Sequence, residues 1–262
     1  SVRIDTEGAA RQLGKPRGRY VTLDLSPLQK NADDLLERAS RAVGAELRAL
    51  LGENVKSVLV AGLGNANMTP DAIGPRSAEH VLVTRHLRQN GAFSAFCSVS
   101  VLTPGVLGRT GIEAMETLRG TVRAVQPDAV IAIDALASRS LARLCTSVQL
   151  SDTGIVPGSG VGNHRKGITA ETMHVPVIAV GIPLVVYAST IVRDALVDMM
   201  QRESGDAQAL AEQLTSGYPR DFVVTPRNID ELVAGLADLL ALAINSALQT
   251  NLEMEELSHC LH

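Results

Sequence analysis

One stretch, residues 58–75, constrains the fold of this chain more than any other, and it reads VLVAGLGNANMTPDAIGP. Its first four residues, Val58–Ala61, are all apolar, which is typical of a buried strand. Two glycines, Gly62 and Gly64, then break the strand, and a helix is expected to begin near Ile73. Because open α/β sheets bind their ligands beyond the carboxyl ends of their strands, this strand–turn–helix unit predicts where a functional site lies.

Apolar strands and helical patterns alternate along the rest of the chain. Continuously apolar segments at 58–61, 129–133 and 175–180 are typical of strands buried on both faces. Strands are also expected at 20–25, 93–102 and 146–150, and helices at 28–51, 74–88, 112–125, 184–201 and 228–248, with 135–144 helical or irregular. This alternation predicts an α/β fold with a single doubly wound, mostly parallel sheet and helices on both faces.

The chain is expected to form one domain over residues 1–262. It contains no internal repeat and no segment with the composition of an interdomain linker. Residues 1–19 are polar and are expected to be irregular, and the acidic tail at 249–262 is expected to be loose.

Charge and composition argue against two classes of partner. The formal net charge is -4, and only 2% of the residues are aromatic, with no Trp, so we expect no direct nucleic-acid binding. No run of 18 apolar residues occurs, so we expect no membrane-spanning helix and no membrane partner.

The three cysteines, Cys97, Cys145 and Cys260, lack metal-ligand spacing and indicate a reducing, cytoplasmic compartment, with Cys97 and Cys145 in the core.

Asp71 and Asp134 are the candidate catalytic residues. Asp71 lies in the turn after the first apolar strand, and Asp134 directly follows the strand at 129–133. If these strands are neighbours, both carboxylates reach one crevice, and the pKa of one carboxyl rises because two close carboxylates do not both ionise readily. One carboxyl then serves as acid while the other activates water as base, as amide hydrolysis requires. In the alternative interpretation, Asp71 is a helix N-cap and Asp134 is a loop acid.

The glycine-rich turn at 62–67 is expected to shape the same site. A dinucleotide-binding fingerprint would need a third glycine where Asn67 stands, so a tight turn with a positive φ is the favoured interpretation. The main-chain N–H groups of such a turn are candidates for an oxyanion hole. The candidate supporting residues of this segment are Gly62, Gly64, Asn65 and Thr69.

A second glycine-rich loop, at 152–166, is expected either to cover a substrate or to be a plain flexible loop. Asp152 is a candidate third acid, and His164 is a candidate ligand or anion contact, with a solvated basic turn as the alternative. The histidines form no cluster, and neither H-E-x-x-H nor G-x-S-x-G occurs. Serine, cysteine and H-E-x-x-H zinc peptidases are therefore unsupported.

Seven consecutive motifs cover nearly the whole chain. They are GKP-x-GRYVTL at 14–23, GLGN-x-N-x-TPDA-x-GP at 62–75, VLVTRHL at 81–87, PGV-x-G-x-TGIE at 104–113, PD-x-VIAIDALA-x-RS at 127–140, SDTGI-x-PGSGVGN-x-RK at 151–166 and VTP-x-NIDEL at 224–232. Together they resemble the germination protease family, the spore endopeptidases of endospore-forming bacteria.

The resemblance implies a specific activity and site. Members of this family degrade small acid-soluble spore proteins early in germination, are made as zymogens and assemble as tetramers, so we expect a homotetramer in the spore core. The family fold is similar to that of the hydrogenase maturation endopeptidases. The two essential aspartates of the family fall in TPDA and IDALA, which here are Asp71 and Asp134, and Ser138 and Arg139 are expected to support them.

Two alternatives remain open at this point. The hydrogenase maturation relatives bind nickel with the help of a histidine, and no histidine of this chain matches that position. We therefore expect no cofactor, although two carboxylates can hold a divalent ion and would then form a metal-assisted maturation peptidase. The other alternative is a binding module that kept the fold and lost the activity.

Overall fold

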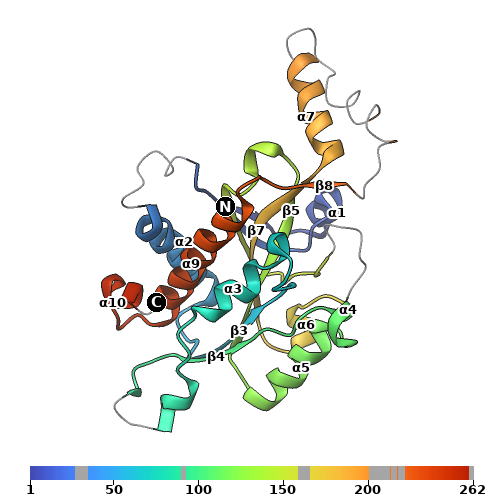
Figure 1. Ribbon diagram of the computed structural model, residues 1–262. Coiled ribbons are helices and arrows are strands. Elements are labelled where there is room, and N and C mark those ends of the chain that lie inside the picture. Colours follow the sequence, from blue (N-terminus) through green and yellow to red (C-terminus); the bar gives the residue numbers. More distant parts are fainter. Residues whose placement is uncertain are drawn as a thin grey trace.

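Figure 1 shows the computed structural model, which describes residues 1–26, 35–89, 93–158, 166–200, 213, 217 and 222–259. Its strands are β1 (Val2–Ile4), β2 (Gly18–Asp24), β3 (Ser57–Gly62), β4 (Ser98–Leu102), β5 (Ala129–Ser138), β6 (Ser147–Ser151), β7 (Val177–Tyr187) and β8 (Val223–Val224). Its α-helices are α1 (Glu7–Leu13), α2 (Leu35–Leu51), α3 (Ile73–Glu79), α4 (Leu107–Thr110), α5 (Ala114–Val125), α6 (Ala170–Met173), α7 (Ala188–Met200), α9 (Ile229–Leu248) and α10 (Met254–His259). Short 3-10 helices are η3 (Thr69–Asp71), η4 (Arg85–Gln89) and η6 (Leu141–Arg143).

The strands form one sheet in the order β1-β2-β6-β7-β5-β3-β4, with β8 paired to the end of β7. The strands β4, β3, β5 and β7 run parallel to one another. The other side of the sheet is antiparallel, because β6 pairs with β7 and β2 pairs with β6. The expectation of a doubly wound, mostly parallel sheet is confirmed, and the antiparallel side is what the sequence did not predict.

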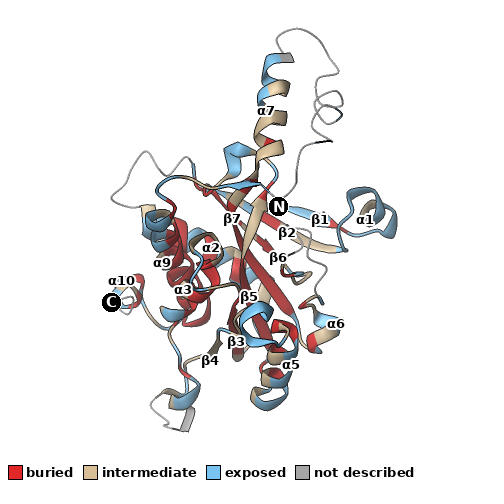
Figure 2. Ribbon diagram, turned by 45° about the vertical axis from the view of Figure 1, so that its right-hand side comes forward, coloured by how far each residue is buried: buried red, intermediate tan, exposed pale blue. Residues whose placement is uncertain are grey.

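Helices cover both faces of the sheet, α2, α3 and α9 on one and α5 and α6 on the other (Figure 1). Alternate side chains of the central strands supply the two cores, since successive residues of a strand point to opposite faces. Val58, Val60, Ile131 and Ile133 pack with α2 and α9. Leu59, Ala61, Val130 and Ala132 pack with α5. In Figure 2 the buried residues accordingly run through the middle of the sheet and along the inner sides of the helices.

The long helix α9 belongs to the first of these cores. Among the described residues, it is the one helix long and apolar enough to cross a membrane, but 67% of its most apolar window is buried inside the protein. Its main chain accepts a 3.1 Å hydrogen bond at Leu239 from the hydroxyl group of Ser40 on α2. These contacts are those of a core helix.

Several predicted boundaries are wrong. β5 continues to Ser138, where an irregular or helical segment was expected from residue 135, because β7 pairs with it along that length. β7 likewise continues to Tyr187, so the helix expected from residue 184 begins at Ala188. The helix expected at 74–88 ends at Glu79, and the strand expected from residue 93 begins at Ser98. The expected start of the 28–51 helix lies outside the described residues.

Both chain ends are more regular than the sequence suggested. The segment 1–19, expected to be irregular, contains β1 and α1. The tail, expected to be loose, contains α10, whose Met254 and Leu257 are buried against α9. Cys145 is buried in the main core and Cys97 packs against it, as expected, while Cys260 lies outside the described residues.

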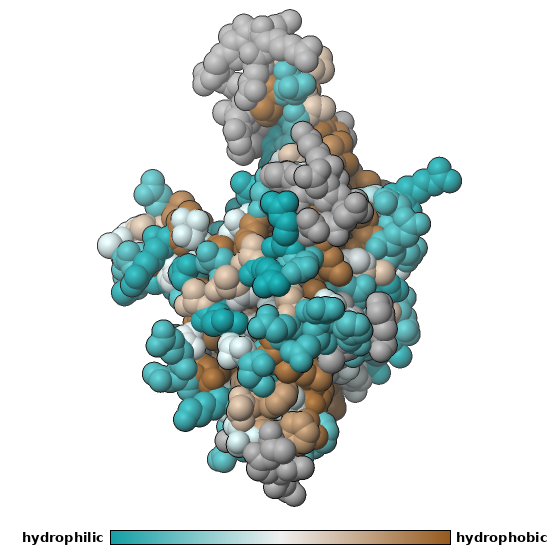
Figure 3. Space-filling view, turned by 90° about the vertical axis from the view of Figure 1, so that its left-hand side faces the viewer, coloured by the Kyte–Doolittle hydropathy of each residue, from teal (hydrophilic) through white to brown (hydrophobic). Residues whose placement is uncertain are grey.

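The helix α7 projects away from the body of the protein (Figures 1 and 2). Apolar atoms are visible on this projecting part in the space-filling view (Figure 3). Met199 at its end is 68% exposed, and Phe222, just before β8, is 66% exposed. The site described next lies at the carboxyl ends of the parallel strands, where β7 leads into this projection.

Candidate active site

The strand–turn–helix unit at 58–75 folds as a tight crossover. Leu63 is the last residue held to the neighbouring strand, through a 2.8 Å bond from its N–H to the carbonyl oxygen of Ile133. The chain then turns through η3 and enters α3, which packs directly against β3. Gly74 allows this approach, because a Cβ atom there would lie 2.2 Å from the carbonyl oxygen of Leu63. The sequence predicted this unit correctly.

Asp71 is held inside the turn by main-chain contacts. Its Oδ2 accepts a 2.8 Å hydrogen bond from the N–H of Asn65, and its own N–H donates to the carbonyl oxygen of Met68. Gly64 has a φ of 109°, and a Cβ atom at this position would lie 2.0 Å from the carbonyl oxygen of Asp71. The carboxylate is therefore fixed by a turn that needs glycine at its tightest point.

Asp71 is not a helix N-cap. The N-cap residue of α3 is Ala72, and the N-cap residue of η3 is Met68; neither cap carries a side-chain hydrogen bond. The carboxylate is half-buried and accepts a hydrogen bond from a main-chain N–H, but it does not begin a helix. The alternative interpretation, in which Asp71 is a helix N-cap, is therefore wrong.

Asp134 lies within β5, so it is not a loop acid either. It is only 6% exposed, and its Oδ1 accepts a 3.0 Å hydrogen bond from the N–H of Ala135. On the adjacent strand β7 it is paired with Gly181. A carboxylate this deeply buried is costly unless it is hydrogen-bonded, and such groups concentrate at functional sites.

The two aspartates come from neighbouring strands. β3 and β5 are adjacent, with Gly62 paired to Ile133, as the two-carboxylate hypothesis requires. The 3-10 helix η3 that carries Asp71 lies against β5 and β7, with Cα atoms within 8 Å of both strands. Both carboxylates therefore belong to the carboxyl end of the parallel strands, where α/β folds place their ligands.

The turn residues support Asp71 more than they offer a site for an oxyanion. The N–H of Asn65 is taken by Asp71, that of Asn67 by the side chain of Asn65, and that of Met68 by the carbonyl oxygen of Asn65. Three amides of the turn are thus already bound within it. These three N–H groups are therefore not open donors for the oxyanion hole that the sequence led us to expect in this turn.

Thr69 connects the turn to a distant element. Its hydroxyl group donates a 2.7 Å hydrogen bond to Oδ1 of Asp230, in the first turn of α9. Thr69 was a predicted supporting residue, but Asp230 was not predicted. The motif at 224–232 was the only sequence signal for Asp230, and it assigned no role to this residue.

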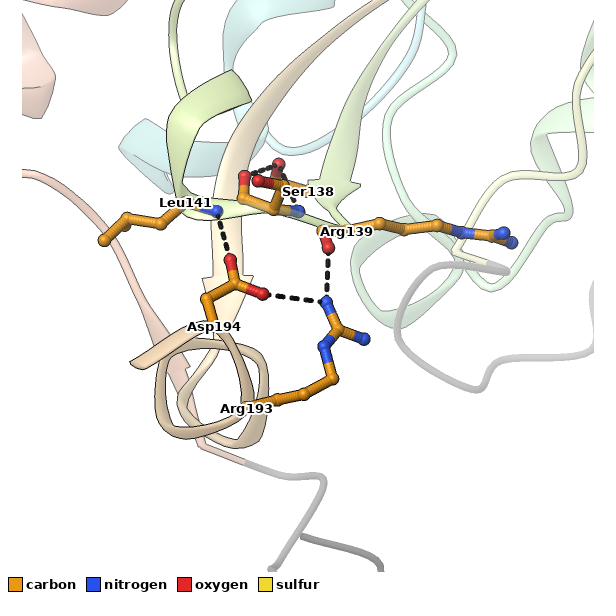
Figure 4. A network of polar contacts seen from close by, with 6 residues as sticks. Ser138, Arg139, Leu141, Arg193 and Asp194 are labelled. Atoms are coloured by element: carbon orange, nitrogen blue, oxygen red, sulfur yellow. Dashed lines mark hydrogen bonds and ion pairs between the residues drawn. The ribbon is translucent and has the colours of Figure 1, made fainter. Parts of the chain in front are cut away.

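Ser138 and Arg139 lie at the end of β5, where a polar network ties that strand to α7 (Figure 4). Arg193 donates a 2.6 Å hydrogen bond to the carbonyl oxygen of Arg139, and Asp194 accepts a 3.0 Å bond from the N–H of Leu141. Ser138 donates from its hydroxyl group to the carbonyl oxygen of Ser140. The side chain of Arg139 points away from this network and is exposed (Figure 4).

Asp152 is not brought to the pair. Asp152 follows β6, which is antiparallel to β7. Gly181 on β7 is paired with Asp134 on one side and with Gln149 of β6 on the other. Asp152 lies three residues beyond Gln149. Two strand spacings and three residues place its backbone roughly 14 Å from that of Asp134. Its Oδ1 accepts a 2.7 Å bond from the N–H of Arg19, and it faces a separate hollow of about 540 Å³. His164 lies outside the described residues.

No larger cluster of ligand side chains accompanies the aspartates in the described part of the chain. There, no group of three or more His, Cys, Asp or Glu side chains is placed to hold a metal ion. Burial raises the pKa of the Cys145 thiol to about 11, so this cysteine is protonated at neutral pH and is a poor nucleophile.

Comparison with known proteins gives one family. The family model "Germination protease" matches residues 1–215. The germination protease of Caldanaerobacter subterraneus subsp. tengcongensis is 43% identical over 285 residues, which cover 100% of this chain and 87% of that protein. The germination protease of Bacillus subtilis is 35% identical over 311 residues, covering 97% of this chain and 84% of that protein.

Solved structures are also similar, among them the NiFe hydrogenase maturation protease HycI from Thermococcus kodakarensis KOD1. The match has a TM-score of 0.42 and 17% sequence identity, and it covers 76% of this chain and 98% of that chain.

Proposed function

We propose that this chain, which belongs to the germination protease family and is therefore a peptidase of spore germination, degrades small acid-soluble spore proteins with two aspartates. The observation that carries the mechanism is the placement of Asp71 and Asp134 at the same end of two adjacent parallel strands. Sequence identity over most of the length of two germination proteases supports the substrate class.

The proposed reaction needs one ionised and one protonated carboxyl. The ionised aspartate takes a proton from water while the water oxygen bonds to the scissile carbonyl carbon. The protonated aspartate gives its proton to the amide nitrogen as the carbon–nitrogen bond breaks. Afterwards the two carboxyls have exchanged protonation states, and a proton transfer through solvent restores the first arrangement. The different surroundings of the two groups, a turn for Asp71 and a buried strand for Asp134, support unequal proton affinities.

The same family resemblance supports three further parts of the proposal. We propose that the protein is made as a zymogen, that it acts as a homotetramer, and that it works in the cytoplasm of the spore core. No cofactor is required by the two-aspartate mechanism.

A metal-assisted peptidase is the second candidate, favoured by one observation, the convergence of two carboxylates. Asp71 and Asp134 alone are fewer ligands than a divalent ion requires. With no third protein ligand grouped with them in the described ranges, water, substrate or a residue such as His164 would have to complete the site. When bound, such an ion would polarise the scissile carbonyl group or activate water.

The experiment is cleavage of a small acid-soluble spore protein by this chain beside Asp71→Asn and Asp134→Asn, with and without chelator. The two-aspartate proposal expects cleavage by the parent, folded and inactive variants, and no effect of chelator. Loss of cleavage with chelator would make the aspartates metal ligands instead. A variant that cuts at the parent's rate would remove that residue from the mechanism, and a binding module would retain its partner without cutting it.

A further inference from the structure

β5 is longer than the strand beside it at the carboxyl end of the sheet. The pairing of β3 with β5 ends at Gly62 and Ile133, and the last bond between the two chains runs from Leu63 to Ile133. β5 continues for five residues beyond Ile133, to Ser138, and on its other side it stays paired with β7. One side of this extension therefore lacks a neighbouring strand in the described part of the chain.

The direction of the main-chain groups on this extension follows from two hydrogen bonds. The N–H of Val130 points to β7, where it donates to the carbonyl oxygen of Pro176, and the carbonyl group of Ile133 points to β3. In a parallel strand, successive residues direct their main-chain groups to alternate sides. The pairing with β7 shifts register between Leu136 and Ala137, but the extra residue lies on β7, so β5 keeps its alternation. Ala135 and Ala137 therefore direct their main-chain groups to the side that β3 has left.

The side chain of Asp134 accepts the hydrogen bond that the N–H of Ala135 would have donated to a longer β3. In a continued ladder the N–H of Ala135 would reach the carbonyl oxygen of Leu63. Instead, α3 begins against that carbonyl group, and the N–H of Ala135 donates to Oδ1 of Asp134. The main-chain edge and the buried carboxylate are thus directly joined.

The edge is accessible. Ala135, Leu136 and Ala137 are half-buried, although the residues before them on β5 are buried. Among the described residues, no hydrogen bond joins another chain segment to the carbonyl oxygen of Ala135 or to the main chain of Ala137 on this side.

We propose that this edge of β5, at Ala135 and Ala137, is the docking strand for the substrate, which binds as an extended peptide and continues the line of β3. An unpaired strand edge binds an extended peptide through main-chain hydrogen bonds. The scissile peptide bond then lies beside Asp134, and recognition depends on backbone conformation more than on side chains. This inference rests on the proposed function, since it takes the substrate to be a polypeptide.

Methylation of peptide nitrogens tests the pairing directly. Overlapping peptides of a small acid-soluble spore protein are first measured for binding to the Asp71→Asn variant, which retains the edge. The peptide that binds best is then resynthesised with one N-methyl group at each successive position. The proposal expects methylation at every second position of one short segment to weaken binding by about fivefold or more, because one hydrogen bond is lost each time. Methylation at the positions between them is expected to have a smaller effect.

A substitution in β5 tests whether the peptide binds to this strand. Ala137→Pro removes the N–H on the open side, and its fold is checked by circular dichroism and thermal unfolding. We expect a raised KM for the unmethylated peptide with little change in kcat. Its sensitivity to methylation should persist, because the methylated peptide nitrogens donate to carbonyl oxygens of β5, which proline retains. If Ala137→Pro is unstable, the methylation pattern measured with alanine present decides the proposal alone.

The outcomes separate this inference from the proposed function. Alternating sensitivity with a peptide that the parent enzyme does not cut would support the docking strand and overturn the proposed activity. Cleavage of a peptide whose methylation pattern shows no alternation would support the activity and overturn the docking strand. Absence of binding by every peptide would overturn the docking strand as well.

Discussion

The hydroxyl group of Thr69 and the carboxylate of Asp230 are joined by a 2.7 Å hydrogen bond across 161 positions of the chain. Thr69 begins the 3-10 helix that ends with Asp71, and Asp230 lies in the first turn of α9. A bond to a charged acceptor is stronger than one between neutral groups, so this contact holds the turn in place.

Loss of this contact is expected to reduce turnover. Thr69→Val removes the donor, and Asp230→Ala removes the acceptor, so Asp71 is held less firmly in each variant. We expect kcat to fall about tenfold, which corresponds to a rise of about 1.4 kcal/mol in the activation free energy, with a small change in KM. The measurement is steady-state cleavage of a spore-protein peptide.

Two controls distinguish positioning from general destabilisation. Asp230→Asn retains a side-chain acceptor and should recover most of the activity, while Glu231→Ala, in the same helical turn, should leave it unchanged. The double variant of Thr69 and Asp230 should be no worse than either single variant. Additive losses would show that the two residues act separately.

Gly64→Ala should damage both the fold and the site. A Cβ atom would lie 2.0 Å from the carbonyl oxygen of Asp71, on a backbone with a φ of 109°. We expect a loss of roughly 2 kcal/mol or more in the free energy of unfolding, measured in urea, and loss of cleavage. The matched variant is Gly120→Ala, which has no heavy atom within 4 Å of the added group and lies inside α5. It should stabilise the protein by about 1 kcal/mol, and equal effects of the two variants would contradict the strain argument.

Cys145 should make stability fall at alkaline pH. Burial raises the pKa of its thiol from 9.0 to about 11. Because the folded state binds this proton more tightly than the unfolded state, the stabilisation is complete below pH 9 and is lost as the pH rises toward 11, with a total of about 3 kcal/mol.

Urea unfolding between pH 8 and 11 measures this dependence. Cys145→Ala should reduce the decline by the contribution of this thiol, while Cys97→Ala serves as a comparison. A parallel decline in the parent and Cys145→Ala would assign it to other groups.

The network at the end of β5 should control how firmly α7 is attached. Asp194→Ala removes the acceptor for the N–H of Leu141 and the partner of Arg193. We expect exchange of the Leu141 amide hydrogen to become about tenfold faster, which corresponds to the loss of one charged hydrogen bond. Asp194→Asn retains an acceptor and should be affected less. Unchanged exchange in Asp194→Ala would mean that the segment beginning at Leu141 is held to α7 by other contacts.

The local parts of the fold were predictable, and the paired parts were not. The apolar runs at 58–61 and 129–133 are strands because both faces are buried, and their composition alone indicates this. Ala135–Ala137 has high helix propensity, yet it is strand because β7 pairs with it. The short pattern of Met254 and Leu257 predicts little by itself, and only contact with α9 explains their burial.

The placement of the candidate site residues in the fold was predictable to the same extent. The sequence identifies Asp71 and Asp134 because each stands beside a core strand, and the neighbouring arrangement of β3 and β5 then brings them to one end of the sheet. Asp152 also follows a strand, but an antiparallel one, whose end points away from the pair. Asp230 carried no local signal, because its contact with Thr69 depends on how α9 crosses the sheet.

The order in which the chain is synthesised gives the Thr69–Asp230 contact a further consequence. Both aspartates of the site leave the ribosome long before Asp230 does, and the helix that covers the turn follows them. A partly made chain therefore contains the chemical groups of the site without the contact that positions one of them. Hydrolytic competence should accordingly arise only when α9 has docked, and neighbouring nascent polypeptides are spared until then.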